Sequence, residues 1–403
     1  MNTLNDTAPI SYWLDTAGDL VRGGDLPRRA GVVVVGAGVM GASVALFLAR
    51  AGADVVLVER GTLAGGATGR NAGIVSPGTT ESYRSTIEAR GHAAARAIWQ
   101  YSEDSAALLR QTLAEEGIDA GYRPEGSYAV ALSEDDETRH QATIEALARD
   151  GFETEWLDAP ALQGRVGVAL PAAIRGARFN PRGAVVHSSR LVCGLADAAA
   201  RHGAAVRTGV AVKAVRQGVV ETGLGDIAAD HVILATNAWT GDLAPGLAQV
   251  IEPVRGQMRA TAPLPGRVFP GAWSANDGGE YWQQTADGAW ALGGMRRVAP
   301  DADRPYTENH LRPEVQAALD EFVNQNFPDL ASAPVAYRWA GIMGFTPDST
   351  PLVGPLSPGL WIAAGCTGHG MPYTTETGRV LAEWICRGQP DRDMSPFDPG
   401  RFG

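Results

Sequence analysis

Lysine is almost absent from this sequence, in which Lys213 is the only lysine among 34 basic residues. Chemistry that needs a lysine amine therefore has one position available. No apolar run approaches the roughly 18 residues that a membrane-spanning helix requires, so no membrane span is expected. The three cysteines, Cys193, Cys366 and Cys386, are odd in number and far apart. That pattern predicts reduced thiols in a cytoplasmic protein.

Other absences narrow the function further. The cysteines lack metal-ligand spacing and the seven histidines do not cluster, so no metal site is expected. The formal net charge of −11 argues against nucleic acid or an anionic membrane as a partner. The N-terminus carries acids and no basic segment followed by an apolar core, so no signal peptide is expected. The chain also contains no internal repeat and no low-complexity segment.

What the sequence does contain is the signature of a dinucleotide site. Residues 32–35 are four valines, an apolar and β-branched run that predicts a buried strand. Gly36, Gly38 and Gly41 follow in the G-x-G-x-x-G spacing. The first allows a tight turn, the second lets backbone approach a pyrophosphate, and the third lets the next helix pack closely. That helix, predicted over residues 40–51, points its N-terminal amides at the phosphate.

A second predicted strand, residues 54–58, ends in Glu59. A carboxylate at this place accepts hydrogen bonds from the two ribose hydroxyls and repels a 2′-phosphate, which disfavours NADP. Strand, glycines, helix, strand and terminal acid in this register predict a dinucleotide site. By itself the signature leaves NAD and FAD equally open.

The order of segment types along the chain predicts two interleaved domains. Nucleotide-type strands and helices alternate with aromatic β-segments, so one domain is inserted into the other. We expect a leader over residues 1–30. The nucleotide-binding domain is expected over 31–117, 180–250 and 336–403, and the β-rich substrate domain over 118–179 and 251–335. A ligand is expected between the lobes, at the carboxyl ends of the strands.

Three local patterns give more detailed expectations. Residues 82–117 carry one long helical pattern, and residues 121–132 alternate like a strand. A helix is predicted over residues 188–202, with Ser188 or Ser189 as its N-cap.

Five stretches that cover nearly the whole chain carry a family resemblance. They are VVVVGAGVMGASVALFLARAGADVVLVER, GGATGRNAGIV, VILATNAWT, IEPVRGQM, and RWAGIMGFTPDSTPLVGP followed by IAAGCTGHGM. Together they resemble the D-amino-acid-oxidase-like FAD amine oxidoreductases, among them glycine oxidase, monomeric sarcosine oxidase and γ-glutamylputrescine oxidase. The resemblance implies an α/β fold, with a Rossmann-type, glutathione-reductase-like FAD domain and an interleaved β-sheet-rich substrate domain. It also implies hydride transfer from a C–N carbon to flavin, giving an imine that hydrolyses.

The resemblance implies FAD contacts at positions that match the family motifs. Glycine turns and small residues line the pyrophosphate and flavin, Arg70 faces anionic oxygens, and Val212 meets the adenine. The implied cofactor-binding residues are Gly36, Gly38, Val39, Met40, Gly41, Glu59, Arg60, Ala67, Thr68, Arg70, Asn71, Ala72, Gly73, Val212, Thr236, Asn237, Trp239, Gly341, Gly344, Gly365, Gly368, His369, Gly370 and Met371.

Departures from the relatives predict how the flavin is held. Sarcosine oxidase joins its flavin to a cysteine, and the matching position here is about Gly341. Other relatives use a histidine in the first flavin loop, where this chain has Arg70. Neither residue forms such a bond, so the resemblance implies non-covalent FAD.

The substrate clamps of two relatives are also missing. Met343 stands where glycine oxidase has a carboxylate-binding arginine, and Pro372 stands where sarcosine oxidase has a lysine. A thioether cannot replace a bidentate guanidinium, so an α-amino acid held as in those relatives is disfavoured. Residues 341–348 look nearer to the γ-glutamylputrescine oxidase branch, which oxidises amines. Four arginines remain open as a different clamp: Arg84, Arg255, Arg296 and Arg338.

Amine oxidation by flavin needs no dedicated general base, because the protein only orients the C–H bond and keeps the amine neutral. Aromatic faces hold amines by cation–π attraction. Tyr281 and Trp339 are the preferred pair in the cleft, and His369 is expected to bind flavin or to modulate the substrate amine. A structural role stays open for each of the three.

The electron acceptor and the setting of the reaction stay open. Sarcosine oxidase activates oxygen with a lysine in its substrate sheet, and residues 290–293 here contain none. Oxygen and another carrier are both possible acceptors. Besides a free-standing amine oxidase or dehydrogenase, two alternatives remain. One is a subunit of an opine- or proline-dehydrogenase-like complex, and the other is a non-catalytic flavin-binding partner protein. A homo-oligomer or a heteromeric partner is compatible with each.

Overall fold

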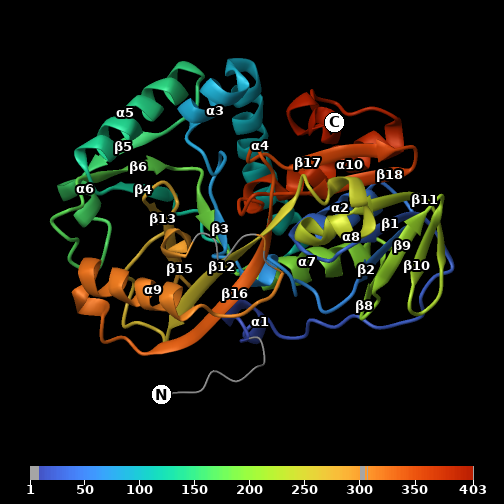
Figure 1. The fold of residues 1–403 in the computed structure, drawn as a ribbon, viewed down its shortest axis with the longest axis horizontal. Coiled ribbons are helices and arrows are strands. Elements are labelled where there is room, and N and C mark those ends of the chain that lie inside the picture. Colours follow the sequence, from blue (N-terminus) through green and yellow to red (C-terminus); the bar gives the residue numbers. More distant parts are fainter. Residues whose placement is uncertain (1–8, 300–304, 306, 403) are drawn as a thin grey trace.

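The computed structural model describes residues 9–299, 305 and 307–402. In this part of the chain the strands form two eight-stranded sheets and one small pair, β3 (Ile74–Val75) with β7 (Ala184–Val185). Figure 1 shows the two large sheets in separate lobes, with β17, β18 and the C-terminus in the same lobe as β1 and β2. The chain therefore returns to the first lobe after building the second, as expected for an α/β protein with an inserted β-rich part.

The first sheet is built around the strand that precedes the glycine signature. Parallel neighbours flank this strand on both sides, which buries its valines. The strand order is β17 (Leu352–Ser357), β18 (Leu360–Ala364), β11 (Ile227–Leu234), β1 (Arg29–Val35), β2 (Val55–Glu59) and β8 (Ala205–Thr208), with β9 (Val212–Arg216) and β10 (Val219–Thr222) attached to β11.

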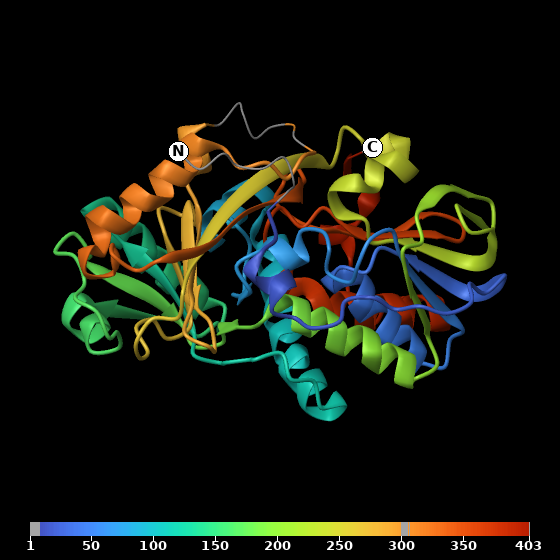
Figure 2. The same cartoon turned by 90° about the horizontal axis from the view of Figure 1, so that it is seen from below.

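Helix α2 (Val39–Arg50) packs against this sheet with α7 (Ser188–Arg201) and α10 (Thr374–Arg387) on either side (Figure 2). The turn that leads into α2 has Gly36 at φ +103°, a left-handed conformation that favours glycine. A Cβ at Gly36 would also lie 2.8 Å from the carbonyl oxygen of Ala235. These contacts explain why glycine occupies the position.

The second sheet carries its own core. Its order is β16 (Val335–Phe345), β12 (Glu252–Thr261), β15 (Trp290–Gly294), β14 (Glu280–Gln284), β13 (Ala272–Ala275), β4 (Ser127–Ala131), β6 (Gly176–Asn180) and β5 (Glu155–Asp158). One face packs on α9 (Pro313–Asn326) through buried aromatic side chains, among them Trp273, Trp282 and Trp290. Trp282 and Trp290 therefore fill a core, whereas Trp273 belongs to this core and also lines the cavity between the lobes.

Strand β16 pairs with β12 along its whole length and belongs to the second sheet. The sequence division at residue 336 had assigned this segment to the nucleotide domain. In Figures 1 and 2, β12 and β16 are long strands that reach from the second lobe toward the first. Their ends therefore contribute to the space between the lobes.

The helical pattern over residues 82–117 is two helices rather than one. Helix α3 (Tyr83–Arg90) ends at Gly91, whose φ of +82° interrupts the helix before α4 (His92–Glu116) begins. The predicted strand over 121–132 is shorter than expected, since only β4 forms there. The remaining elements are α1 (Tyr12–Asp15), α5 (Glu134–Arg149), α6 (Ala159–Gln163), α8 (Thr240–Leu243) and the short turns Thr68–Arg70, Asn237–Trp239, Pro245–Leu247, Arg296–Val298, Pro328–Leu330, Met371–Tyr373, Ser395–Phe397 and Pro399–Phe402.

None of the helices described is long and apolar enough to cross a membrane. Likewise, the described residues contain no group of three or more His, Cys, Asp or Glu side chains placed to hold a metal ion.

The N-cap of α7 is His187, not Ser188 or Ser189 as the sequence predicted. Its Nδ1 accepts a hydrogen bond from the Arg190 amide at 3.2 Å, and its Nε2 lies 2.9 Å from the Thr16 hydroxyl. Burial, reinforced by the charge of Arg190, lowers the pKa of His187 to about 4. The imidazole is therefore neutral in the folded protein at pH 7.

Replacing His187 with asparagine is expected to flatten the pH dependence of stability. The unfolded histidine takes up a proton near its ordinary pKa of about 6.5, whereas the folded one does so near pH 4. The stabilising contribution is therefore complete above pH 6.5. It falls by about 1.4 kcal/mol per pH unit below that value. Asparagine keeps an N-cap acceptor but does not titrate. Urea unfolding at saturating FAD between pH 7.5 and 5 measures the difference, and parallel curves would contradict it.

Candidate functional site

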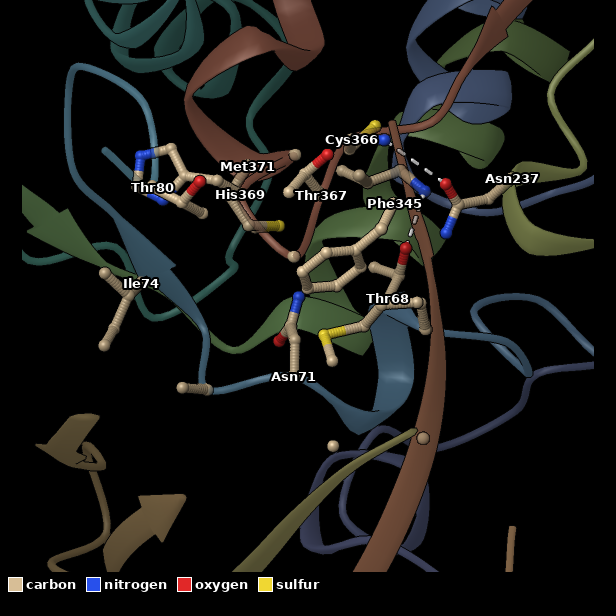
Figure 3. A pocket seen from close by; sticks show the side chains of 18 of the residues that line it. Thr68, Asn71, Ile74, Thr80, Asn237, Phe345, Cys366, Thr367, His369 and Met371 are labelled. Carbon is tan, nitrogen blue, oxygen red and sulfur yellow. Dashed lines mark hydrogen bonds between the residues drawn. The ribbon is translucent and has the colours of Figure 1, made fainter. Parts of the chain in front are cut away.

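A cavity of about 1340 Å³ extends from the glycine turn after β1 to the face of β6 and α5 in the second lobe. Its walls come from the carboxyl ends of β1, β2 and β11, the 65–72 segment, the 366–371 turn, and strands of the second sheet. Figure 3 shows the middle of this space, where residues of the 366–371 turn face Phe345 and Asn71. A ligand in the cavity would contact both lobes.

At the first glycine turn, side chains hold the backbone in place. Glu59 Oε2 accepts a hydrogen bond from the Ala37 amide at 2.9 Å, and its Oε1 accepts one from the Gly61 amide at 2.8 Å. The hydroxyl of Thr68 accepts from the Val39 amide at 3.1 Å. These bonds fix the Glu59 carboxylate at the edge of the cavity, where its remaining lone pairs can accept ribose hydroxyls.

The second glycine turn is fixed by Asn237, which follows β11. Asn237 has φ +48°, and its Oδ1 accepts hydrogen bonds from the amides of Gly365 at 3.1 Å and Cys366 at 3.5 Å. Figure 3 shows the Asn237 side chain directed at Cys366. A Cβ at Gly344 would come within 2.9 Å of the same Oδ1. Gly344 and Gly365 therefore build the turn and do not line the cavity themselves.

Arg70 presents a half-buried cation to the cavity. Its aliphatic stem packs so closely on Gly341 that a Cβ there would lie 2.6 Å from the Arg70 Cβ. Nη1 donates to the carbonyls of Ala340 at 3.1 Å and Pro9 at 3.2 Å. Nε is buried without a hydrogen-bond partner, and no described carboxylate pairs with this guanidinium. Burial lowers its pKa. A cavity-lining guanidinium with an unpartnered Nε is suited to an anionic ligand group.

The three residues expected near the substrate have different placements. Tyr281 lines the cavity, and burial raises its pKa, so its hydroxyl stays protonated at pH 7. His369 also lines the cavity, but its Nε2 donates to the Ser76 carbonyl at 2.8 Å, and burial lowers its pKa. Trp339 is 0% exposed and lies behind the wall, where its indole donates to the Arg70 carbonyl at 2.8 Å. Trp339 therefore positions Arg70.

Most of the predicted cofactor residues meet at this one cavity. Gly41, Gly73, Gly344 and Gly365 do not line it. The others do, namely Gly36, Gly38, Val39, Met40, Glu59, Arg60, Ala67, Thr68, Arg70, Asn71, Ala72, Val212, Thr236, Asn237, Trp239, Gly341, Gly368, His369, Gly370 and Met371.

Of the four arginines considered as substrate clamps, Arg84 and Arg296 line the cavity. Arg255 is fully buried outside it, and Arg338 pairs with Asp320 at 2.7 Å. The guanidinium of Arg296 lies 5.1 Å from the ring centre of Phe345. Arg296 is thus a candidate cation that lines the cavity beside Phe345, two residues from Met343.

No sequence pattern indicated the charged groups at the far wall. Arg178 on β6 and Arg139 and His140 on α5 all line the cavity. Burial, with Arg178 as the next cause, lowers the pKa of His140 to about 4, so this imidazole is neutral. β6 was not predicted as a strand, and no local pattern around Arg178 distinguishes it from a surface arginine.

Comparisons with known proteins agree with this geometry. A family model described as FAD dependent oxidoreductase matches residues 31–384. The chain is 30% identical to the probable oxidoreductase OrdL of Rhizobium meliloti over 88% of this chain and 83% of that protein. It is 30% identical to γ-glutamylputrescine oxidoreductase of Escherichia coli, over 90% of this chain and 84% of that protein. Among solved structures, glycine oxidase from Geobacillus kaustophilus superimposes with a TM-score of 0.80 at 25% identity, covering 93% of this chain and 99% of the other.

Proposed function

Because the chain belongs to the family of FAD-dependent oxidoreductases and uses FAD, we propose that it oxidises the C–N bond of a primary or secondary amine or of an N-substituted amino acid. The observation that carries the proposal is the continuous cavity. It joins a nucleotide cradle at Gly36–Glu59 to a wall that contains the uncharged side chains of Tyr281, Met343 and Phe345, with Arg296 beside Phe345. The related γ-glutamylputrescine oxidoreductase and glycine oxidases, by their names, act on such compounds.

Different residues of the cavity fit different parts of FAD. Glu59 would hold the ribose, and the turn before α2 would face the pyrophosphate. Arg70, whose Nε has no partner among the described residues, would face the anionic part of the flavin together with the 366–371 turn. When bound, FAD supplies the acceptor for a hydride from the carbon next to nitrogen.

The chain's own contribution is to orient the substrate and to exclude water. The phenol of Tyr281 stays protonated and offers a hydrogen-bond donor and an aromatic face to an amine. Burial lowers the pKa of His369 against the opposing effect of its bond to the Ser76 carbonyl, so the imidazole adds no charge that would repel a protonated amine. Met343 supplies no charge where a carboxylate clamp would stand, which favours amines without an α-carboxylate.

Anaerobic mixing of the holoprotein with a panel of primary amines, secondary amines and N-substituted amino acids tests this function. Bleaching of the flavin absorbance by one class supports the proposal. If no amine bleaches the flavin while dithionite does, the proposal fails and the non-catalytic alternative is favoured. Admitting air afterwards identifies the acceptor. Fast recolouring indicates oxygen, and slow recolouring indicates another carrier, as in the complex-subunit alternative.

We also propose that FAD is held without a covalent bond. The one cysteine that lines the cavity, Cys366, has its pKa raised to about 12 by burial, so its thiol is a poor nucleophile. His369 uses its Nε2 for Ser76. Acid precipitation is therefore expected to leave the yellow colour in the supernatant, and colour that stays with the pellet would contradict this.

A cytoplasmic location is proposed from the thiols. Cys193, Cys366 and Cys386 are all free, and reducing compartments keep such thiols unpaired. Fractionation of the source cells followed by detection of the protein tests this proposal.

A further inference from the structure

Arg178, at the α5 end of the cavity, is a half-buried cation that forms no ion pair with any described residue. Its Nε has no hydrogen-bond partner, and the part of the chain that the structure describes offers it no ion pair. Burial lowers the pKa of Arg178 to about 10, so it still carries its charge at pH 7. A buried, unpaired guanidinium is unfavourable for folding, and such a group is retained where a ligand supplies the missing partner.

The acids nearby do not fill that role. Asp277 also lines the cavity, and its charge partly offsets the effect of burial on Arg178. However, Asp277 forms its ion pair with Arg139, at 3.0 Å, and not with Arg178. Arg139 is also paired with Asp136 at 2.6 Å. The other polar neighbours are neutral. The His140 pKa is lowered to about 4, and the Thr143 hydroxyl donates to the Arg139 carbonyl at 2.8 Å.

The register of the second sheet connects Arg178 to the flavin end of the cavity. Arg178 lies opposite Ala129, Ala129 opposite Ser274, and Ser274 opposite Tyr281. Residues paired in this way point to the same face of a sheet. Three strand spacings separate the backbones of Arg178 and Tyr281 by about 14 Å. Both residues between them are small and line the cavity, so the face between guanidinium and phenol is open.

The flavin end of this row is identified by its neighbours. A Cβ at Gly256 would meet Met343 Cε at 2.9 Å and the Tyr281 hydroxyl at 3.7 Å, and one at Gly368 would meet Met343 Sδ at 3.1 Å. Tyr281 and Met343 therefore adjoin the 366–371 turn. The reacting C–N bond belongs at this end.

We propose that Arg178 binds the carboxylate of an elongated amine whose reacting C–N bond lies beside Tyr281. This inference rests on the proposed function and specifies its substrate class: a carboxylate several bonds away from the amine, not on the carbon that is oxidised. The guanidinium fork matches a carboxylate in bidentate geometry. This arrangement explains both side chains. Met343 is uncharged because no carboxylate binds beside the reacting carbon, and Arg178 is cationic because the carboxylate binds at the other end of the cavity.

The test compares N-methyl-ω-amino acids of increasing chain length with their primary amides, which have the same shape and no charge. With the wild-type holoenzyme, a long acid is expected to exceed its amide in kcat/KM. In Arg178→Met, kcat/KM for that acid is expected to fall about 100-fold, chiefly through KM, with the amide little changed. Arg178→Lys keeps the charge without the fork and should lie between. Arg175→Met is the matched control, since Arg175 is an exposed arginine paired with Glu137 at 2.6 Å outside the cavity.

A binding measurement separates this inference from the proposed function. Straight-chain carboxylates that cannot be oxidised are titrated into the holoprotein, with the flavin spectrum and calorimetry as readouts and the matching alcohols as controls. If no amine reduces the flavin but the carboxylates bind and Arg178→Met abolishes that binding, the proposed function fails and the anion site stands. Equal use of acids and amides by the wild type would overturn the inference, as would unchanged carboxylate binding in Arg178→Met. Should Arg178→Met not fold, Arg178→Gln takes its place in both measurements.

Discussion

Replacing Gly41 with valine is expected to give protein that lacks flavin. A Cβ at this position would overlap the carbonyl oxygen of Gly36 and come within 3.2 Å of the Ala235 Cβ. Gly36 belongs to the turn after β1, and Ala235 directly follows β11. Neither segment can move away without displacing the backbone that faces the phosphates. Overpacking of this kind typically costs about 1–3 kcal/mol of stability, and the distorted turn loses the cofactor as well. The ratio of flavin to protein absorbance after purification measures the outcome.

Gly246→Ala is the matched control for the glycine signature. A Cβ at Gly246 would have nothing within 4 Å, and the residue lies outside the cavity. It is expected to bind FAD as the wild type does. Gly41→Ala provides a smaller perturbation that still introduces the clashing Cβ. Its FAD affinity is expected to lie between those of Gly41→Val and Gly246→Ala. A Gly41→Val protein that binds FAD with wild-type affinity would contradict the close packing of α2 on the turn.

Replacing Arg70 with methionine is expected to weaken FAD binding about 10- to 100-fold and to lower the midpoint potential of the bound flavin. The guanidinium is buried against Gly341, and its Nε has no partner within the described residues, so a charge-assisted bond to the cofactor is lost. A nearby cation also favours the state of the cofactor that carries more electrons, and methionine removes it. Equilibrium FAD titration and a redox titration of the holoprotein check the two effects.

The controls for Arg70 separate its charge from its shape. Arg70→Lys retains a cation without the planar fork and is expected to recover the potential more fully than the affinity. Arg216→Met removes an exposed arginine that pairs with Glu221 at 2.8 Å. It is expected to change neither quantity. If Arg70→Met bound FAD normally and kept the wild-type potential, Arg70 would have only a packing role against Gly341.

The sequence by itself determined the nucleotide half of the protein. Four valines, three glycines and a terminal acid predicted α2 and β2 to within one residue at each end and β1 with a start three residues too late, because their requirements are local. Gly36 needs a left-handed backbone, and Gly41 needs the absence of a Cβ, whatever surrounds them. The same is true of the family resemblance, since its motifs are short turns that carry their own steric demands. FAD as cofactor followed from these turns, and the family match confirms it.

The roles of individual cavity residues depended on contacts between distant segments. The bond of His369 joins it to Ser76, and Trp339 lies behind Arg70, so neither placement is visible in a local pattern. Strand β16 looked like part of the nucleotide domain until its pairing with β12 placed it in the second sheet.

Arg178 shows the difference most clearly. It lies on a strand that has no local signature, and its neighbours on the sheet come from β4 and β5. In the sequence it is one arginine among many, because charge can be read from a residue but burial cannot. Burial, pairing register and the absence of a counter-charge are properties of the assembled sheet and the helix that covers it. The sequence therefore determined which cofactor the chain uses, and only the tertiary structure decided that Arg178 lines the cavity without an ion pair to any described residue.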